Sequence, residues 1–549
     1  MNDEIDKDVE TASGSQTPDD QSKPGLNLGH RLGSRLKEFA FSVKVPPVKV
    51  PFDFSRLLHW RHFSFVHERK ENAASRLRFY AFVLLLASLT YLVAVPFLHD
   101  YLVETWKLLP VGLAAALFTA LAILQIKVFE RHRLSLRLLL MGANVLCGVV
   151  LVGYLFFANT TGWYIESAMA ASLKPAVWKE LPETENLRIL GQGTAGWYLH
   201  SRNLDNRQDA VGLPQLVREC SGDTCELWWQ SAYSFKRGRI GSWLPRVLGS
   251  TQSILRVSAS ELETAGGATA GADTHFLFGQ ESVITELLFR FHHPISERAE
   301  ATYHHNTDDS WSLLIPYITR RPTITGVMVP ALGGVMEVSQ NGWVRDHSVA
   351  DATRLFPGSV LYPSVLARSY GEAYGHYRTG LVNVFVNESG IYQISEDPAR
   401  PGENEQPYVQ GFKALGEGSP LQEVIAFEPA GKQSFGLSEL LFFDAQTGKA
   451  HVYSVPPTAG LHGPRRALKQ ATNADPETDW NAYSIQEPRL VVRPALAGSD
   501  GQQRFWLMTE VKNEGEDHTA VRLILTDMVT LKTKGFDSRA AMEHYLQGS

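Results

Sequence analysis

Three long runs of apolar residues near the start of the chain constrain its fold more than any other feature. They cover residues 79–98, 108–126 and 138–158, and none of them contains Asp, Glu, Lys or Arg. A helix that rises about 1.5 Å per residue needs roughly 20 apolar residues to cross the hydrocarbon core of a bilayer. The sequence therefore predicts an integral membrane protein with three N-terminal transmembrane helices.

The basic residues that flank these runs predict an orientation. Residues 52–78 carry six Lys or Arg, and the loop 127–137 carries four, whereas the loop 99–107 has two acids and one lysine. Basic loops stay on the cytoplasmic side of a membrane. We therefore expect a cytoplasmic N-terminus and an extracytoplasmic domain from residue 159 onward. The absence of a cleavable signal and the compact three-span anchor favour the cytoplasmic membrane of a bacterium.

The segment before the first span has two parts. Residues 1–51 are predicted to be a disordered cytoplasmic tail, because the first twenty residues hold seven acids, one lysine and few apolar side chains. Residues 52–78 interleave aromatic and basic side chains and are predicted to form an amphipathic juxtamembrane segment. This segment is either an interfacial helix on anionic lipid or an ordinary cytoplasmic flank.

The spans are predicted to anchor the protein and to pack against other helices. They contain no charge, and intramembrane charges are what mark a transport route. Small residues recur every fourth position in the second span, and the third span holds a polar side chain that could hydrogen-bond across a helix contact. Such a face would serve packing within the chain or a homo-oligomer, unless the spacing is chance. The helix-packing candidates are Gly112, Ala116, Ala120 and Asn144.

The part after the spans is acidic and rich in β-type patterns. Residues 159–549 hold 34 Lys and Arg against 44 Asp and Glu, which argues against a nucleic-acid partner. Short runs of alternating polarity and turn residues predict a membrane-anchored α+β protein with interspersed helices at residues 165–178 and 351–377. We expect one extracytoplasmic domain at 159–330 and α+β hairpin modules at 331–549.

Four segments of the second part are predicted to be β-hairpins. Each has two apolar or alternating runs around a central turn, and three of the turns contain glycine, which accepts the positive φ that tight turns demand. The turns are Asn341-Gly342, Ser389-Gly390, Thr447-Gly448 and the weaker Asp527-Met528. The predicted hairpins cover residues 335–348, 381–395, 440–455 and 520–536.

The third hairpin carries a resemblance to a known kind of module. Its turn, Asp444-Ala445-Gln446-Thr447-Gly448-Lys449, resembles the closing hairpin of PepSY-type modules, which often end in an Asp-x-x-Thr-Gly-Lys turn. The segment 461–468, followed by Asp479-Trp480, also looks like bacterial membrane proteins of unassigned function. The resemblance implies a non-catalytic extracytoplasmic module that binds or inhibits a partner, and it carries over no active-site residue.

Two cysteines are predicted to form a disulfide. Cys220 and Cys225 are separated by Ser-Gly-Asp-Thr, a turn sequence with strand-like flanks. A bond across a tight hairpin fits this spacing, and an extracytoplasmic compartment keeps it oxidised. A metal site or two free thiols are the alternatives, but two sulfurs without nearby histidine make a poor zinc site. Cys147 lies in a span and is expected to serve packing.

A glycine-rich segment matches the dinucleotide-binding fingerprint without its context. Residues 191–196 read Gly-Gln-Gly-Thr-Ala-Gly and follow a possible strand at 187–190. The fingerprint requires a helix whose N-terminus holds the pyrophosphate. Because residues 197–200 read as strand and then polar loop, we predict a glycine-rich turn and no cofactor.

Histidines and carboxylates gather in one stretch. Such side chains could bind a divalent metal, but a polar loop with diverging histidines is the more common outcome. The sequence contains no Gly-x-Ser-x-Gly elbow, no His-Glu-x-x-His and no Walker loop, although a dispersed active site needs none of these. The metal candidates are His292, His293, His304, His305, Asp308 and Asp309.

The preferred interpretation is a non-enzymatic, membrane-anchored component of a membrane or envelope assembly. Its expected partners are the lipid bilayer and a protein bound by the extracytoplasmic domain, with a homo-oligomer as a further possibility. The alternative is an extracytoplasmic, metal-dependent hydrolase that acts on envelope material and uses the 292–309 stretch.

Overall fold

The computed structural model describes most of the chain after the tail. The predictions for residues 1–51, and for all but the end of 52–78, concern residues outside the described set. The chain divides into two compact units, Met1–Phe82 and Val83–Ser549, and every side-chain contact given below lies within the second. The described residues are 73–128, 134–201, 208–222, 224–235, 251–262, 274–396, 403–413, 419–431, 436–495, 501–514 and 517–548.

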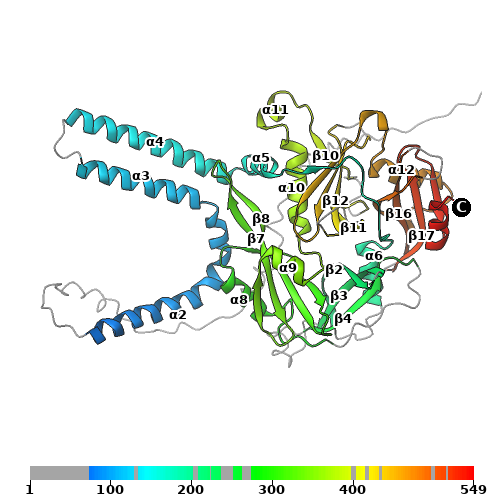
Figure 1. Cartoon of the computed structure of the whole chain (residues 1–549), viewed down its shortest axis with the longest axis horizontal. Coiled ribbons are helices and arrows are strands. Elements are labelled where there is room, and N and C mark those ends of the chain that lie inside the picture. The colour runs from blue at the N-terminus through cyan, green and yellow to red at the C-terminus, as the bar shows by residue number, and fades with distance from the viewer. Residues whose placement is uncertain are drawn as a thin grey trace, which may run out of the picture. The chain divides into compact units, whose positions relative to one another are not determined.

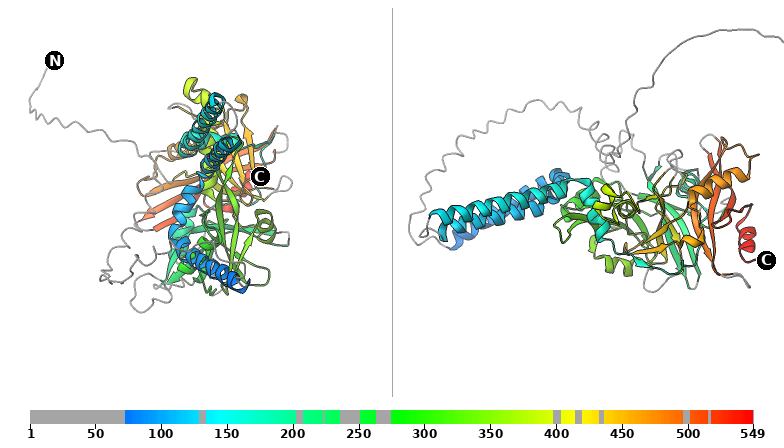
Figure 2. Two further views of the ribbon diagram at one scale, coloured as in Figure 1. Left: turned by 90° about the vertical axis from the view of Figure 1, so that its left-hand side faces the viewer. Right: turned by 90° about the horizontal axis from the view of Figure 1, so that it is seen from above.

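Three apolar helices come first in the described chain. They are α2 (Ala73–Trp106), α3 (Leu109–Val128) and α4 (Leu134–Thr160). The stretches Leu109–Lys127 and Leu138–Thr160 are long and apolar enough to cross a membrane. α3 and α4 lie side by side (Figures 1 and 2), and most of their large apolar side chains point outward. Helices that are apolar all round suit a lipid environment.

The first of these helices is bent. Phe79–Tyr91 and Ala94–Trp106 meet at an angle of 68°, close to Pro96, which cannot donate the backbone hydrogen bond to the preceding turn. The segment predicted as the first span, residues 79–98, therefore includes the bend. The described chain has two helices that are long and apolar enough to span a membrane. It has three if the two halves of the bent helix are counted together as one span. Beyond the bend, one helix face is buried, at Val95, His99 and Val103.

α3 and α4 pack where Asn144 and Gly148 of α4 meet Phe118 of α3. The Asn144 side-chain amide donates a hydrogen bond to the Phe118 carbonyl oxygen at 3.3 Å, which is a bond across the helix contact as the sequence suggested. Gly148 lies so close to the Phe118 ring that a Cβ there would be 2.9 Å from Cγ. The small-residue face stays a prediction, because its members are exposed on α3, at Gly112, Ala116 and Ala120.

The sheet at the centre of the domain is buried on both faces. Even-numbered residues of its middle strands, such as Val424 and Phe442, face one apolar core, and odd-numbered ones, such as Ile425 and Phe443, face another. Successive side chains of a strand point to opposite faces, so both faces need apolar residues. The strand order is β1-β14-β13-β12-β10, with β11 also paired to β12. The strands are β1 (Ala176–Val177), β10 (Tyr392–Ile394), β11 (Tyr408–Gly411), β12 (Leu421–Pro429), β13 (Glu439–Asp444) and β14 (Ala450–Ser454).

Helices cover one face of this central sheet. Aromatic and small residues of one helix, including Tyr374 and Ala367, pack on it together with residues from the segment that follows the membrane helices. These helices are α5 (Gly162–Ser172), α10 (Ser364–Tyr377) and the short α11 (Leu381–Val386).

A second antiparallel sheet, at the C-terminus, covers the other face. Trp506 and Met508 point towards the central sheet, and Phe505 and Leu507 point to a further core on the opposite side. This sheet has the order β15-β16-β17-β18. The elements are the 3-10 turn Pro457–Ala459, α12 (Pro464–Ala474), β15 (Tyr483–Arg493), β16 (Gln503–Glu514), β17 (Asp517–Asp527), β18 (Thr533–Phe536) and α13 (Arg539–Leu546).

Two more antiparallel sheets complete the described domain. One has three strands in the order β2-β3-β4, and the other has the order β5-β7-β8-β9 with β6 beside β7. The two sheets share one apolar core, to which the first contributes Ala232 and Ile254 and the second contributes Leu313. The elements are α6 (Gln192–Ser201), β2 (Gln208–Ser221), β3 (Thr224–Phe235), β4 (Thr251–Ser258), α8 (Val283–His292), β5 (Glu297–Arg298), β6 (Thr302–His305), β7 (Trp311–Pro322), β8 (Met328–Ser339), β9 (Val344–His347) and α9 (Val349–Leu355).

The α+β class is confirmed, as are three of the four hairpins. β8 pairs with β9, β13 with β14, and β17 with β18, each antiparallel. The hairpin predicted at residues 381–395 is wrong, because its first half is the helix α11 and its second half, β10, pairs with β12. The helix predicted at 351–377 is two helices, α9 and α10, and the one predicted at 165–178 ends at Ser172.

The expected boundary at residue 330 lies inside β8. β7 and β8 pair along their whole length, so backbone hydrogen bonds join residues on both sides of this boundary. β1, near the start of the domain, also pairs with β14 near its end. Segments before and after residue 330 therefore share the same sheets, and the chain does not divide into two domains at this residue.

The glycine-rich segment forms the start of a helix, which corrects the prediction of a turn followed by a strand. α6 begins at Gln192 and includes residues 197–200, and no strand is formed at 187–190. Ala195, Tyr198 and Leu199 are buried at helical spacing. A dinucleotide is still not suited to this helix, because the Glu487 carboxylate already accepts a hydrogen bond from the Gln192 backbone N–H at 2.9 Å.

Candidate functional site

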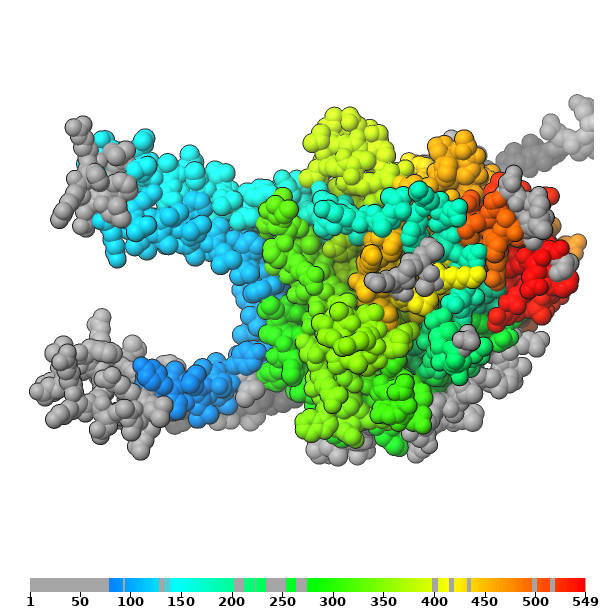
Figure 3. Space-filling model, in the orientation of Figure 1, coloured from blue at the N-terminus to red at the C-terminus, as the bar shows by residue number. Residues whose placement is uncertain are grey.

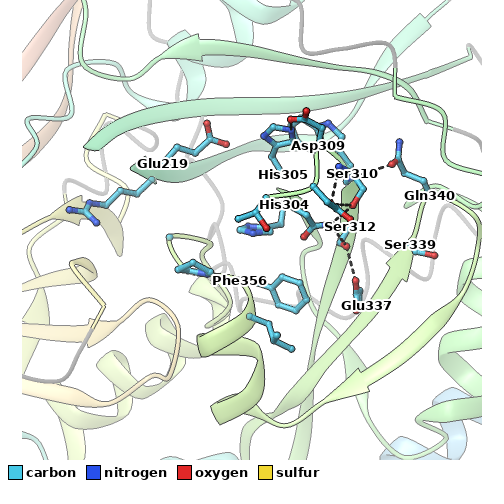
Figure 4. Close-up of a pocket in the computed structure, with 18 of the residues that line it drawn as sticks. Glu219, His304, His305, Asp309, Ser310, Ser312, Glu337, Ser339, Gln340 and Phe356 are labelled. Carbon is cyan, nitrogen blue, oxygen red and sulfur yellow. Dashed lines mark hydrogen bonds and ion pairs between the residues drawn. The ribbon is translucent and has the colours of Figure 1, made fainter. Parts of the chain in front are cut away.

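An open cleft in the domain after the spans is the candidate site. Its volume is about 1360 Å³, and it lies between the β2–β3 hairpin, the β6–β7 turn, the β8–β9 hairpin and the segment after α9. Figure 4 shows Glu219 on one side of the cleft and His304, His305, Asp309 and Glu337 on another. The cleft is thus built from segments that are distant in sequence.

The first wall is the hairpin that carries the disulfide. Cys220 and Cys225 face each other in the β2–β3 register, their Cα atoms are 4.0 Å apart, and their sulfurs are bonded, which confirms the predicted bond. This fixes the register of the hairpin end that lines the cleft. The hairpin is held to the rest of the domain at Gly358, whose carbonyl accepts from the Arg218 backbone N–H at 3.0 Å. Gly358 has φ of 79°, and a Cβ there would be 2.0 Å from the Arg218 carbonyl oxygen.

An arginine links the first wall to the second. Arg256 of β4 makes two hydrogen bonds to the Glu219 carboxylate, at 2.9 and 2.7 Å. Its guanidinium lies 4.7 Å from the centre of the Trp311 ring on β7. The parallel N–H···O bonds and the aromatic stack fix this arginine in place. It therefore closes the cleft floor between the two sheets.

The second wall contains four of the six metal candidates. His304 Nδ1 is 2.9 Å from the Ser359 hydroxyl oxygen, and burial lowers the pKa of His304 to about 4. His305 Nε2 is 3.6 Å from Asp309 Oδ1, and Asp308 accepts from the Ser310 backbone N–H at 3.1 Å. Each of these polar groups thus has a protein partner in the wall itself.

The third wall is the β8–β9 hairpin. The Glu337 carboxylate accepts a hydrogen bond from the Ser312 hydroxyl at 2.7 Å and lies 2.8 Å from His347 Nε2. Trp343, just before β9, is 75 % exposed, and Arg345 on β9 is also exposed. Arg345 forms no ion pair with any residue that the structure describes. These two side chains alternate with inward-facing ones, so both project towards solvent.

The structure does not bring the six metal candidates together. His292 and His293 are at the end of α8, where the His293 ring stacks on Tyr317 at 3.9 Å and the His99 ring approaches the His293 carbonyl at 3.1 Å. His304 contacts Ser359 and Phe356 instead. Within the described ranges, no three His, Cys, Asp or Glu side chains form a group that could hold a metal ion.

The serines near the cleft are not arranged as activated nucleophiles. Ser359 is 1 % exposed, so a substrate has no access to its hydroxyl beside His304. Ser312 donates to a carboxylate rather than to an imidazole. Nucleophilic catalysis requires an accessible hydroxyl next to a base that is oriented by a third group. The cleft geometry fits recognition better than acyl or phosphoryl transfer.

Sequence reasoning missed the residues that distinguish this cleft. Trp343 and Arg345 lie just after the correctly predicted Asn341-Gly342 turn, on either side of Val344, the first residue of β9. An exposed tryptophan beside an arginine in a hairpin was the available signal. Glu219, Arg256 and Glu337 carried no signal, because only the tertiary fold brings them to one cleft.

Comparison with known proteins gives no relative. No protein-family model, no curated protein and no solved structure matches this chain. The likeness of the Asp444–Lys449 turn to PepSY-type modules is therefore a likeness of one hairpin, and the geometry of the cleft is the basis for any statement about function.

Proposed function

We propose that this chain is a membrane-anchored binding protein whose extracytoplasmic domain holds a segment of a partner protein in the cleft. The cleft is the single observation that carries the proposal. At about 1360 Å³ it exceeds the roughly 300–1,000 Å³ of typical small-molecule sites. An open, large and polar cleft suits a loop or strand of another protein better than an enclosed small ligand.

The side chains at the cleft edge support a protein partner. Trp343, just before β9, and Arg345, on β9, are both exposed. Tryptophan and arginine dominate the energetics of protein interfaces, because each buries a large area at a defined geometry. Charges in the cleft are mixed: four Arg are accompanied by five Asp or Glu, which disfavours a polyanion.

The proposed setting follows the predicted topology. The N-terminus is in the cytoplasm of a bacterium, three spans anchor the chain in the cytoplasmic membrane, and the partner belongs to a membrane or envelope assembly. The apolar helices and the disulfide support a membrane location and an oxidising compartment. The rival proposal, a metal-dependent hydrolase, has no grouped set of metal ligands among the described residues to support it.

The test is photo-crosslinking in intact membranes, with a benzophenone amino acid at position 343 and, as the matched control, at Val529. Val529 is exposed in the β17–β18 turn, away from the cleft. We expect one discrete crosslinked protein from position 343 and none from 529. The double variant Trp343→Ala, Arg345→Ala should lose the phenotype as fully as a truncation after Thr161, while Arg466→Ala, exposed on α12, should not.

A separate variant distinguishes the hydrolase. His305 lines the cleft and is a third exposed, so His305→Ala leaves the fold intact and removes a metal candidate. A binding protein should keep its crosslink and phenotype in this variant. A His305→Ala protein that folds, crosslinks normally and yet behaves like the truncation contradicts the binding role and favours catalysis.

A further inference from the structure

Aromatic residues gather where α4 ends. The rings of Tyr154 and Tyr164 are 6.2 Å apart, and Phe157 lies 5.7 Å from Trp163 and 5.8 Å from Tyr164. Phe385 of α11 joins this group through an edge-on contact with Trp163 at 5.7 Å. Tryptophan and tyrosine are enriched where a transmembrane helix meets the headgroup layer. α11 is thus attached to the end of a membrane-spanning helix.

The β7–β8 turn packs beside the same helix. The Asn159 side chain donates to the Gly326 carbonyl at 3.1 Å and accepts from the Met328 backbone N–H at 2.7 Å. A Cβ on Gly326 would be 2.7 Å from a methyl group of Leu155. Leu155 precedes the helix end at Thr160 by five residues, about 7.5 Å along the axis. The turn therefore reaches past the end of α4 to the level of its apolar stretch.

Both elements expose large apolar side chains. Ile324, at the tip of the β7–β8 turn, is fully exposed, and Val382, Phe385 and Val386 of α11 are 75, 63 and 72 % exposed. Figure 3 shows α11 projecting from the surface of the domain. Apolar side chains in such number on one short helix mark an interaction surface.

We infer that the extracytoplasmic domain contacts the bilayer directly, at two places besides its membrane helices. Ile324 inserts among the acyl chains of the adjacent leaflet, beside Leu155. α11 lies in the headgroup layer on its Val382, Phe385 and Val386 face. Lipid is the occupant because both elements pack beside the end of α4, a helix apolar enough to cross a membrane, whose Phe156 and Phe157 are also exposed at this level.

Two lipid contacts would fix the orientation of the cleft relative to the membrane. One is made by the hairpin β7–β8, and β7 and β8 also carry Trp311 and Glu337 of the cleft walls. A domain that rests on the membrane at Ile324 and α11 cannot rotate freely about α4. This inference is independent of the proposed binding function, since lipid contact can be measured without a partner.

The experiment places a fluorescent probe at each contact in the full chain. Cys147 is first replaced by Ser, so that Ile324→Cys or Phe385→Cys carries the only free thiol besides the Cys220–Cys225 disulfide. Each variant is labelled with a polarity-sensitive fluorophore and reconstituted into lipid nanodiscs. Val529→Cys is the matched control, an exposed aliphatic residue in the turn of another hairpin.

The expected pattern depends on depth. Spin-labelled lipid with its label in the acyl chain should quench the probe at 324 strongly, and headgroup-labelled lipid should quench the probe at 385. The control probe should respond only to iodide in the aqueous phase. A probe at 324 or 385 with a water-like spectrum and full iodide quenching overturns the corresponding contact. A probe shielded from both iodide and spin-labelled lipid is covered by protein, which also overturns it.

Discussion

Glu487 and Glu423 are two carboxylates whose surroundings in the fold favour opposite charge states. Glu487 is on β15 at a β-bulge and has a positive φ of 45°, which turns its side chain to the start of α6. There it meets Arg188 at 2.6 Å and Arg489 at 3.5 Å. Glu423, near the start of β12, accepts a hydrogen bond from the Ser364 hydroxyl at 2.8 Å and has no cationic partner among the residues that the structure describes.

The two surroundings set opposite charge states. Burial by itself would raise the pKa of Glu487, but the two arginines and the Gln192 N–H hold it below its ordinary value. Burial raises the pKa of Glu423 to about 8, because the Ser364 hydrogen bond offsets only part of the cost of burying the anion and Glu300 adds repulsion. Neither group lines the cleft. The pKa shifts of Glu487 and Glu423 thus reflect how the core is built around each of them.

The largest effect should come from removing the charge of Glu487. Glu487→Gln leaves Arg489 and Arg188, which are 0 and 2 % exposed, without their anion. Breaking a buried pair from one side typically costs about 3–5 kcal/mol. We expect a loss of that size in the free energy of unfolding, measured by urea titration of the detergent-solubilised protein. Glu477→Gln, exposed near the end of α12, is the control and should leave stability unchanged.

The matching change at Glu423, Glu423→Gln, should increase the free energy of unfolding, whereas Glu487→Gln should decrease it. An acid with a raised native pKa loses stability as the pH rises from 4.5, where the unfolded state releases its proton, to about 8. Glu423→Gln removes this loss and keeps an acceptor for Ser364. We expect the variant to be more stable than the natural protein by about 3 kcal/mol at the upper end of this range, and equal to it at the lower end. A variant that is destabilised throughout would show that Glu423 is ionised and paired.

These carboxylates also show how far sequence reasoning reaches. Local patterns predicted the apolar helices, the Cys220–Cys225 hairpin and the turns at Gly342 and Gly448, since each depends on neighbouring residues. Residues 381–386 have strand-like composition but form the helix α11, which buries Val384 in the core beside the central sheet. Nothing local distinguishes a glutamate that will meet two arginines from one that will meet none.

The same limit explains the errors at the candidate site. The histidine pairs at 292–293 and 304–305 are close in sequence, but a helix end and a strand carry them to different surroundings. Residues of the actual cleft come from β2, β3, β4, β6, β7, β8 and β9. The disulfide could be predicted because a hairpin brings its two members together, whereas the cleft depends on contacts between sheets.

A buried base extends the comparison to positive charge. His304 is surrounded by Glu219, Glu337, Arg256 and His305, yet burial dominates and lowers its pKa to about 4. A base with a lowered native pKa contributes stability that is complete above about 6.5 and lost as the pH falls towards 4. We expect the natural protein to lose about 2 kcal/mol over that range, and His304→Gln to lose less. Thermal unfolding at a series of pH values measures this, with His305→Gln as the exposed control.

The smallest effect on stability should come from the ion pair in the cleft. Glu219 and Arg256 are joined by two hydrogen bonds, as Glu487 is joined to its arginines, but the Glu219 side chain is 39 % exposed. Water can solvate either partner when the other is removed, so exposed pairs contribute at most about 1 kcal/mol. We expect Glu219→Gln to change the free energy of unfolding within that limit, and a double-mutant cycle with Arg256→Gln to give a coupling that weakens as salt is added. A coupling as large as the loss in Glu487→Gln, and insensitive to salt, would make this pair part of the core. In that case the cleft wall would be structural, and partner binding would have to rest on Trp343 and Arg345 alone.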